Sequence, residues 1–217
     1  MSSDSVHQST ESSERAAVLA ELGSATLGES GARPMRARLH AVWRGARLAA
    51  PAYTVRCTPG DNLALHVAVA RAPAGYALAV DVGDEPERGY WGEVLTTGAE
   101  AHGLAGLVID GGVRDTDALE AHRFPVFATT VALPGATKTA PGTVGEPVVV
   151  GGAPVDVGDW LVGDADGVVV VPGAILDDVI AAGRARQEKE QNLFVALREG
   201  RTTLELLGLE GSPVAGS

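Results

Sequence analysis

Cysteine is nearly absent from this chain, because Cys57 is the only one among 217 residues. A single thiol cannot form an intrachain disulfide, and nothing places Cys57 with His or other thiols at metal-ligand spacing. It stands in the apolar run P-A-Y-T-V-R-C, where a cysteine behaves as a small hydrophobic side chain. We therefore interpret Cys57 as a structural residue of a strand.

Basic residues and long apolar runs are also scarce. The 17 Lys and Arg residues are outnumbered by 28 Asp and Glu residues, and the formal charge of −11 disfavours binding to a phosphate backbone. No apolar run approaches the ~20 residues of a membrane span, and the N-terminus lacks the basic and apolar regions of a signal peptide. The sequence predicts a cytoplasmic protein that binds neither nucleic acid nor a membrane.

What is present is a large aliphatic core. Hydrophobic residues make up 45% of the chain and aromatic residues only 4%, and the length suits one domain. Residues 1–15, M-S-S-D-S-V-H-Q-S-T-E-S-S-E-R, are polar and rich in Ser, so we expect a disordered tail there. We expect a single domain over residues 16–210, which includes a long charged helix over residues 174–199.

Predicted strands and helices alternate through the middle of the chain. A strand over residues 51–57 is followed by a helix that Asp61 can cap, and then by a strand over residues 77–82. A helix over residues 89–103 leads into a further strand over residues 104–110. This order predicts βαβ crossovers and an α/β fold, in which ligands bind at the carboxyl ends of parallel strands.

Short strands and turns follow. A helix is expected near residues 116–122, and then the strand P-V-F-A-T-T. The stretch V-V-V-G-G-A-P-V predicts a hairpin with Gly151-Gly152 at its tip, and V-G-D-A-D-G-V-V-V-V-P predicts another turn between strands.

The stretch L-A-G-L-V-I-D-G-G-V-R-D-T-D-A-L begins as a buried strand and ends in glycines and charges. Arg114 can hold a carboxylate with two parallel hydrogen bonds, and Asp115 offers a hard oxygen of the kind that Mg²⁺ or Mn²⁺ prefers. The start of the preceding helix favours an anion, because its backbone N–H groups are free. Those groups lie around Gly92, Glu93, Val94 and Leu95. We expect the two features to converge at one edge of a parallel sheet.

Ordinary structural roles stay open for the same residues. Arg114 and Asp115 could form a surface ion pair, with Asp115 capping the next helix. Gly111-Gly112 could make a tight turn, and Glu93 could be a solvated partner of the helix dipole. Structural or exposed roles are expected for three further side chains, those of His66, His102 and Lys138.

At these residues the chain resembles the 4-hydroxy-4-methyl-2-oxoglutarate aldolase/RraA-like family, one branch of which is named for regulating ribonuclease E. The resemblance lies in W-G-E-V-L followed by G-L-A-G-L-V-I-D-G-G-V-R-D. It extends, in the same order, to P-G-D-N-L-A-L-H-V-A-V-A, A-T-K-T-A-P-G and G-D-W-L-V-G-D-A-D-G-V-V-V-V-P. It covers residues 19–190.

The resemblance implies a three-layer β/β/α sandwich of the swivelling-domain type, assembled as a homotrimer or hexamer with sites between subunits. It implies substrate binding by residues 92–95 and Arg114, metal binding by Asp115, and catalytic roles for both Arg114 and Asp115. A glutamate from a neighbouring subunit's C-terminal helix is expected near the waters of the metal, and Glu190 or Glu188 could supply it. Ala118 departs from the family, which often has an acid there.

The implied activity is a retro-aldol cleavage of 4-hydroxy-4-methyl-2-oxoglutarate-type 2-oxo acids to pyruvate, with oxaloacetate decarboxylation as a side activity. Mg²⁺ or Mn²⁺ would act as a Lewis acid, and Arg114 would neutralise the developing negative charge. Two other functions stay open. One is a non-catalytic regulator that binds a ribonuclease or an RNA helicase. The other is a lyase or hydrolase of other oxo acids on the same metal scaffold.

Overall fold

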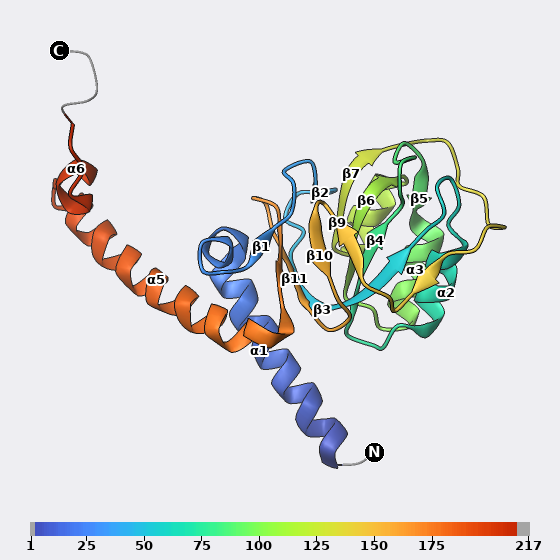
Figure 1. Ribbon diagram of the computed structural model, residues 1–217, viewed down its shortest axis with the longest axis horizontal. Coiled ribbons are helices and arrows are strands. Elements are labelled where there is room, and N and C mark those ends of the chain that lie inside the picture. Colours follow the sequence, from blue (N-terminus) through green and yellow to red (C-terminus); the bar gives the residue numbers. More distant parts are fainter. Residues whose placement is uncertain (1–2, 212–217) are drawn as a thin grey trace.

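The computed structural model describes residues 3–211 (Figure 1). The helices are α1 Ser3–Gly28, α2 Leu63–Arg71, α3 Glu93–Ala101, α4 Thr116–His122, the 3-10 helix η1 Gly173–Ile175, α5 Leu176–Arg198 and α6 Thr203–Leu207. The strands are β1 Arg33–Pro34, β2 His40–Ala41, β3 Leu48–Arg56, β4 Ala77–Asp81, β5 Gly89–Trp91, β6 Gly106–Val113, β7 Val126–Val131, β8 Thr143–Val144, β9 Val148–Val150, β10 Ala153–Val155, β11 Trp160–Gly163 and β12 Val168–Val171.

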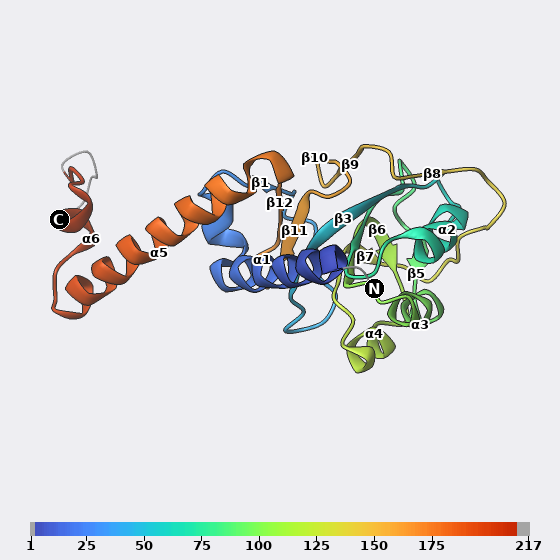
Figure 2. The ribbon, with the colours of Figure 1, turned by 90° about the horizontal axis from the view of Figure 1, so that it is seen from below.

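Four parallel strands, in the order β3-β4-β6-β7, form the middle of the sheet. Helices α2, α3 and α4 connect them in turn, and the three helices gather at the same end of the molecule (Figures 1 and 2). Residues 77–80 of β4 are all buried, as expected for a parallel strand that is covered on both faces. The predicted βαβ units are confirmed, and the carboxyl ends of these strands lie at one edge of the sheet.

The sheet curls beyond β3, where β11, β12 and β1 add antiparallel strands. The hairpin β9–β10 lies against β4, and a core of small and branched side chains fills the space between these strands. Alanines on β3 and β4 leave room for Val148, Val150 and Phe127, so that the two β layers approach closely. The predicted α/β fold with three β/β/α layers is confirmed: a curled mixed sheet is flanked by helices.

Both predicted turns between antiparallel strands are confirmed. Val150 pairs with Ala153 across Gly151-Gly152, and Gly163 pairs with Val168 in the β11–β12 pair. Gly151 and Gly152 both have a positive φ, of 58° and 80°, which glycine adopts without the cost that a Cβ atom imposes. The predicted helices near residues 63–71, 116–122 and 174–199 are also present.

The expected helix over residues 89–103 is only partly right. Residues 89–91 form the strand β5, which pairs in parallel with β6, and helix α3 begins at Glu93. The physical reason is burial: Tyr90 and Trp91 are at most 1% exposed, and the Trp91 ring stacks on Phe124. Two consecutive buried aromatic residues point to opposite faces of a strand and favour that conformation over a helix.

The glycines that follow Asp110 do not make a turn. Strand β6 continues through Gly111 and Gly112 to Val113. A Cβ atom on Gly111 would lie 2.7 Å from Val82 Cγ2, and one on Gly112 would lie 2.5 Å from the carbonyl oxygen of Arg88. The tight-turn alternative is therefore wrong, and the glycines instead leave room for the Val82 side chain and the Arg88 backbone.

The N-terminal segment also differs from expectation. Residues 3–15, expected as part of a disordered tail, form the first part of α1, whereas residues 1 and 2 lie outside the described residues. Glu11 and Arg15 form an i,i+4 ion pair of the kind that supports an exposed helix. At Gly23 the helix is kinked, with φ 76°, and beyond this residue the chain coils on to Gly28.

At the other end of the chain, α5 packs its first turns on α1 and then leads away from the body of the molecule (Figures 1 and 2). Leu176, Val179 and Gly183 are its buried residues. No helix within residues 3–211 is long and apolar enough to cross a membrane.

Candidate active site

A cavity of about 250 Å³ lies where β5 and β6 end and α3 begins. Of the six site residues predicted within one chain, five line it: Gly92, Val94, Leu95, Arg114 and Asp115. Glu93 is the exception, since its backbone is at the helix start but its side chain is exposed. The cavity is also lined by Asn62, His66, Gly89, Tyr90, Trp91, Gly135, Ala136 and Lys138.

Asp115 is held in a left-handed backbone conformation, with φ 58° and ψ 40°. Its Oδ2 accepts a hydrogen bond from the backbone N–H of Glu93 at 3.2 Å. Its side chain makes no capping hydrogen bond to α4, although Asp115 directly precedes that helix. The capping alternative is therefore wrong, because the carboxylate turns toward the start of α3 instead. Asp and Asn tolerate this backbone region better than most residues.

Gly92 makes this approach possible. A Cβ atom at Gly92 would lie 2.4 Å from Asp115 Oδ2 and 3.2 Å from Arg114 Cγ. Arg114 is fixed by its backbone, whose N–H donates to the carbonyl of Trp91 at 2.9 Å. The stretch W-G-E thus has a steric reason for its glycine: any side chain there would displace the Arg114–Asp115 pair.

The ion pair between Arg114 and Asp115 is present but loose. Arg114 Nε lies 3.8 Å from Asp115 Oδ2, and the two side chains are 46% and 42% exposed. An exposed pair at this distance contributes only about 0–1 kcal/mol to folding. Both groups are therefore accessible from the cavity, with the guanidinium beside the carboxylate.

The first turn of α3 adds backbone donors to the same wall. A helix leaves its first N–H groups without intrahelical partners, and here Asp115 takes only that of Glu93. Val94 and Leu95 follow in the same turn and line the cavity. The Glu93 carboxylate points elsewhere, with Oε1 at 3.8 Å from His122 Nε2.

The opposite wall was not predicted from the sequence. It consists of Asn62 and His66 at the start of α2, with Lys138 from the loop between β7 and β8. Asn62 is 5% exposed, and within the described residues its Oδ1 and His66 Nε2 are buried atoms without hydrogen-bond partners. Both residues line the cavity, and an unpaired buried polar atom calls for a partner that the described residues do not supply. The sequence did contain a signal for this wall, because P-G-D-N and A-T-K-T both belong to stretches that resemble the family.

The ring of His66 is biased toward its neutral form. Burial lowers the pKa of His66 first, and the positive charge of Lys138 lowers it further, against the opposing effect of Asp61. A neutral imidazole can either donate or accept a hydrogen bond at Nε2.

The donor set at Asp115 suits a hard divalent cation that keeps most of its waters. Within the described part of the chain, no three His, Cys, Asp or Glu side chains cluster closely enough to hold a metal ion. Mg²⁺ commonly binds through one or two carboxylates and several waters, so a single half-exposed carboxylate in a polar cavity fits it. Zinc would require more protein ligands than these residues provide.

The predicted helper glutamates lie on the far side of the molecule. Glu190 forms an ion pair with Arg186 at 2.9 Å, and Glu188 is exposed. Both belong to the part of α5 that leads away from the body, whereas α2 and α3 lie at the opposite end (Figure 1). Neither reaches the cavity of its own chain.

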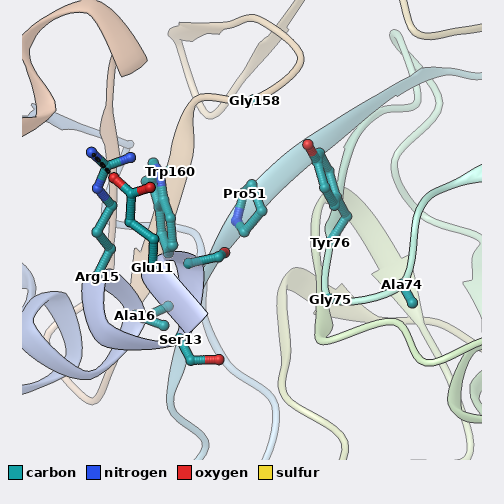
Figure 3. A pocket seen from close by; sticks show the side chains of 12 residues that line it. Glu11, Ser13, Arg15, Ala16, Pro51, Ala74, Gly75, Tyr76, Gly158 and Trp160 are labelled. Carbon is teal, nitrogen blue, oxygen red and sulfur yellow. Dashed lines mark ion pairs between the residues drawn. The ribbon is translucent and has the colours of Figure 1, made fainter. Parts of the chain in front are cut away.

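A larger cavity of about 740 Å³ lies between α1, the strands β3 and β11, and the residues before β4 (Figure 3). Its two charged lining residues, Glu11 and Arg15, lie 2.9 Å apart and neutralise each other. Tyr76 closes the other side, at the amino ends of the parallel strands. Because ligands of α/β proteins bind at the carboxyl ends, we place the candidate site in the smaller cavity.

Residues 16–170 match the RraA-like family, described as Aldolase/RraA. The chain belongs to the RraA-like family. The predicted family membership is confirmed, and the matched residues include both walls of the cavity.

Individual relatives of this RraA-like chain carry two kinds of name. A Halalkalibacterium halodurans protein named "Putative 4-hydroxy-4-methyl-2-oxoglutarate aldolase" is 35% identical, over 65% of this chain and 67% of its own. The solved "RNA-processing inhibitor RraA from Thermus thermophilis" is 30% identical with a TM-score of 0.59, and the match covers 65% of this chain and 84% of that one. Streptomyces coelicolor RraAS2, titled an unusual member of the RNase ES inhibitor RraA family, is 26% identical with a TM-score of 0.72 over 82% and 94% of the two chains.

Proposed function

We propose that the chain is a carbon–carbon lyase that depends on Mg²⁺ or Mn²⁺. Its reaction is the retro-aldol cleavage of 4-hydroxy-4-methyl-2-oxoglutarate-type 2-oxo acids to pyruvate, and oxaloacetate decarboxylation is a side activity at the same site. The observation that carries the proposal is the position of Asp115, whose carboxylate is directed into a polar cavity beside Arg114 and the first turn of α3.

The 2-oxo acid end of the substrate fits the wall formed by Asp115, Arg114 and α3. The N–H groups of Val94 and Leu95 hold its carboxylate, where the helix dipole also favours negative charge. A cation held by Asp115 would supply Lewis-acid charge to the keto oxygen. The Arg114 guanidinium stabilises the negative charge that develops on the same oxygen as the C3–C4 bond breaks.

The distal end of the substrate fits the opposite wall. Asn62 and His66 line the cavity and can hydrogen-bond the C4 hydroxyl, whose proton passes to the neutral imidazole of His66 as C4 becomes a carbonyl. Lys138 lies where it can pair with the second carboxylate. The electrons of the broken bond move to the 2-oxo acid end, C3 takes up a proton, and both products of 4-hydroxy-4-methyl-2-oxoglutarate are pyruvate.

The site is shared between copies of the chain in this proposal. The arm formed by the second half of α5 and by α6 exposes Phe194, Val195, Leu204 and Leu207 to between 42% and 52%. Exposed apolar side chains on a projecting helix favour a contact with another molecule. In a homotrimer or hexamer the arm carries Glu190 or Glu188 to the neighbour's Asp115, where a second carboxylate completes the surroundings of the cation.

A pyruvate-coupled assay tests the activity. Purified protein is stripped with EDTA and then given 4-hydroxy-4-methyl-2-oxoglutarate or oxaloacetate, with and without Mg²⁺ or Mn²⁺. Rates are measured against both buffer and the Asp115→Asn variant, because the cations alone also promote oxaloacetate decarboxylation. We expect turnover that requires the cation and Asp115. Full activity in a verified metal-free preparation would falsify the metal-dependent mechanism.

A regulatory role is the second candidate, since two solved relatives are titled as inhibitors of RNA processing or of an RNase. A pure binder has no need of an accessible Asp115 or of the unpaired atoms on Asn62 and His66. Pull-down of a ribonuclease by both wild type and Asp115→Asn, together with no pyruvate from any 2-oxo acid, would favour this role over the lyase.

A further inference from the structure

The carboxylate of Asp61 is buried next to the cavity, and both of its oxygens accept hydrogen bonds. Asp61 is 2% exposed. Its Oδ1 accepts from the N–H of Leu63 at 2.8 Å. Its Oδ2 accepts from Thr137 Oγ1 at 2.7 Å and from the N–H groups of Thr139 at 2.6 Å and Ala140 at 3.0 Å. One carboxylate therefore ties the start of α2 to the loop between β7 and β8.

The residue between these donors is Lys138. Its neighbours on either side, Thr137 and Thr139, both bind Asp61 Oδ2. Two backbone hydrogen bonds brace the same place: Asn62 N–H donates to the carbonyl of Thr137, and Thr137 N–H donates to the carbonyl of Gly60, each at 2.9 Å. The Lys138 side chain is exposed, so its backbone alone fixes where the ammonium group can reach.

An ionised carboxylate is needed for this arrangement. Burial alone would raise the pKa of Asp61, but the hydrogen bonds from Leu63, Thr137, Ala140 and Thr139 outweigh it and hold the pKa well below its ordinary value. Three donors converge on Oδ2. An asparagine would either place its NH₂ group against those donors or lose the bond to Leu63, because an amide has only one accepting oxygen.

We propose that Asp61 is a positioning residue, which sets Lys138 over the cavity and thereby gives the site its preference for 2-oxo acids with a second carboxylate. The proposal rests on the proposed function for the identity of the substrate. Asp61 itself touches no ligand. Its effect is on the opposite wall of the cavity, at Lys138. It does not alter the positions of Arg114 and Asp115 on the other wall.

Kinetics of Asp61→Asn test the proposal with two substrates that differ in the second carboxylate. For 4-hydroxy-4-methyl-2-oxoglutarate we expect KM to rise about tenfold while kcat changes less than about threefold. For 4-hydroxy-2-oxopentanoate, which lacks that carboxylate, both values should stay near those of wild type. An equal loss on the two substrates, or no loss on either, would overturn the proposal.

The control is Asp159→Asn. Asp159 is also buried, at 7% exposure, and accepts backbone hydrogen bonds from Asp156 at 3.0 Å and Gly173 at 2.9 Å, but it lies outside the cavity. It should lower stability without changing the ratio of the two KM values.

Thr137→Val removes one donor to Asp61 and keeps the shape of the side chain. It should shift the ratio in the same direction by a smaller factor, even where Asp61→Asn folds poorly.

A double-mutant cycle shows whether Asp61 acts through Lys138. In a Lys138→Met background, Asp61→Asn should have no further effect on KM, because the group that it positions is gone. A full additional loss would overturn the proposed route.

A binding readout separates failure of this proposal from failure of the lyase activity. The rate at which an acylating reagent modifies Lys138 can be monitored by mass spectrometry. In wild type, 2-oxoglutarate should lower this rate and 2-oxobutyrate should not. Asp61→Asn should abolish that protection and speed amide exchange at Thr139 and Ala140. If wild type turns over no 2-oxo acid yet shows this pattern, the lyase proposal fails and the positioning role stands. Unchanged protection and exchange in Asp61→Asn would refute the positioning role.

Discussion

Asp115 Oδ2 lies 3.2 Å from the backbone nitrogen of Glu93 and accepts its hydrogen bond, so a side chain at the end of β6 meets the first turn of α3. The contact joins two βα units at the carboxyl edge of the sheet. It directs one carboxylate into the cavity, beside the guanidinium of Arg114.

Asp115→Asn should abolish turnover and leave the fold intact. Asparagine tolerates the left-handed conformation at this position and keeps the size of the side chain, but it removes the charge that holds a cation. Circular dichroism and the thermal midpoint should stay near wild type, while pyruvate formation falls to the uncatalysed rate. Retained turnover would mean that the cation is held elsewhere.

Arg114→Lys should lower kcat/KM for carboxylate substrates by more than about tenfold, because lysine keeps the charge but loses the planar pair of donors. Steady-state kinetics with 4-hydroxy-4-methyl-2-oxoglutarate provide the measurement. Arg123→Lys is a matched control, since Arg123 ends α4 and does not line the cavity. Wild-type kinetics in Arg114→Lys would support a plain surface ion pair.

Gly112→Ala should destabilise the protein by about 1–3 kcal/mol, since its Cβ atom would meet the Arg88 carbonyl oxygen at 2.5 Å and the backbone would have to move. Gly98→Ala is the opposite case: it lies inside α3 with only an ordinary contact at 3.5 Å. It should stabilise by ~0.5–1 kcal/mol. Urea unfolding measures both, and equal midpoints for the two variants would contradict the packing role of Gly112.

Mixing two inactive variants tests the shared site. Asp115→Asn chains and Glu190→Ala chains should each lack activity, and subunit exchange between them should restore part of it, because some sites then combine an intact Asp115 with an intact Glu190 from another chain. Light scattering should report a trimer or larger. If Glu190→Ala alone keeps full activity, the test is repeated with Glu188→Ala, and full activity in both would rule out this arm as a contributor.

Cys57 should resist alkylation until the protein unfolds. Burial first, and then the negative charges of Asp61 and Asp81, raise the pKa of Cys57 from its ordinary 9.0 to about 12, so the thiol stays protonated in the folded state. A raised pKa contributes stability that is complete below pH 9 and is lost as the pH rises toward 12. Iodoacetamide labelling should therefore track the urea unfolding curve at pH 8. Rapid labelling of native protein would contradict the burial of Cys57.

Some of the site was visible in the sequence because it is local. Arg114 and Asp115 are adjacent, they follow an apolar strand, and residues 92–95 begin a helix just before that strand. Alternating strand and helix patterns were enough to predict parallel βαβ units, since each pattern depends on burial of nearby residues. The same locality explains the predicted hairpin at Gly151-Gly152.

Other features depend on contacts that no local pattern encodes. The local sequence of Gly111 and Gly112 is compatible with a turn. Only the folded structure shows that Val82 and Arg88 pack closely against them. His66 and Lys138 have the local patterns of ordinary helix and loop residues, and only the folded chain shows that both line the same cavity.

The sequence by itself thus determined the α/β order of elements, the aliphatic core and the Arg114–Asp115 pair, because periodic burial and adjacent residues are properties of short segments. Only the tertiary structure decided that Asp115 turns away from its own helix α4 toward α3, and that Asn62, His66 and Lys138 form the second wall. The physical reason is that strand order and the close approach of backbones at glycine bring together residues that are far apart in the chain.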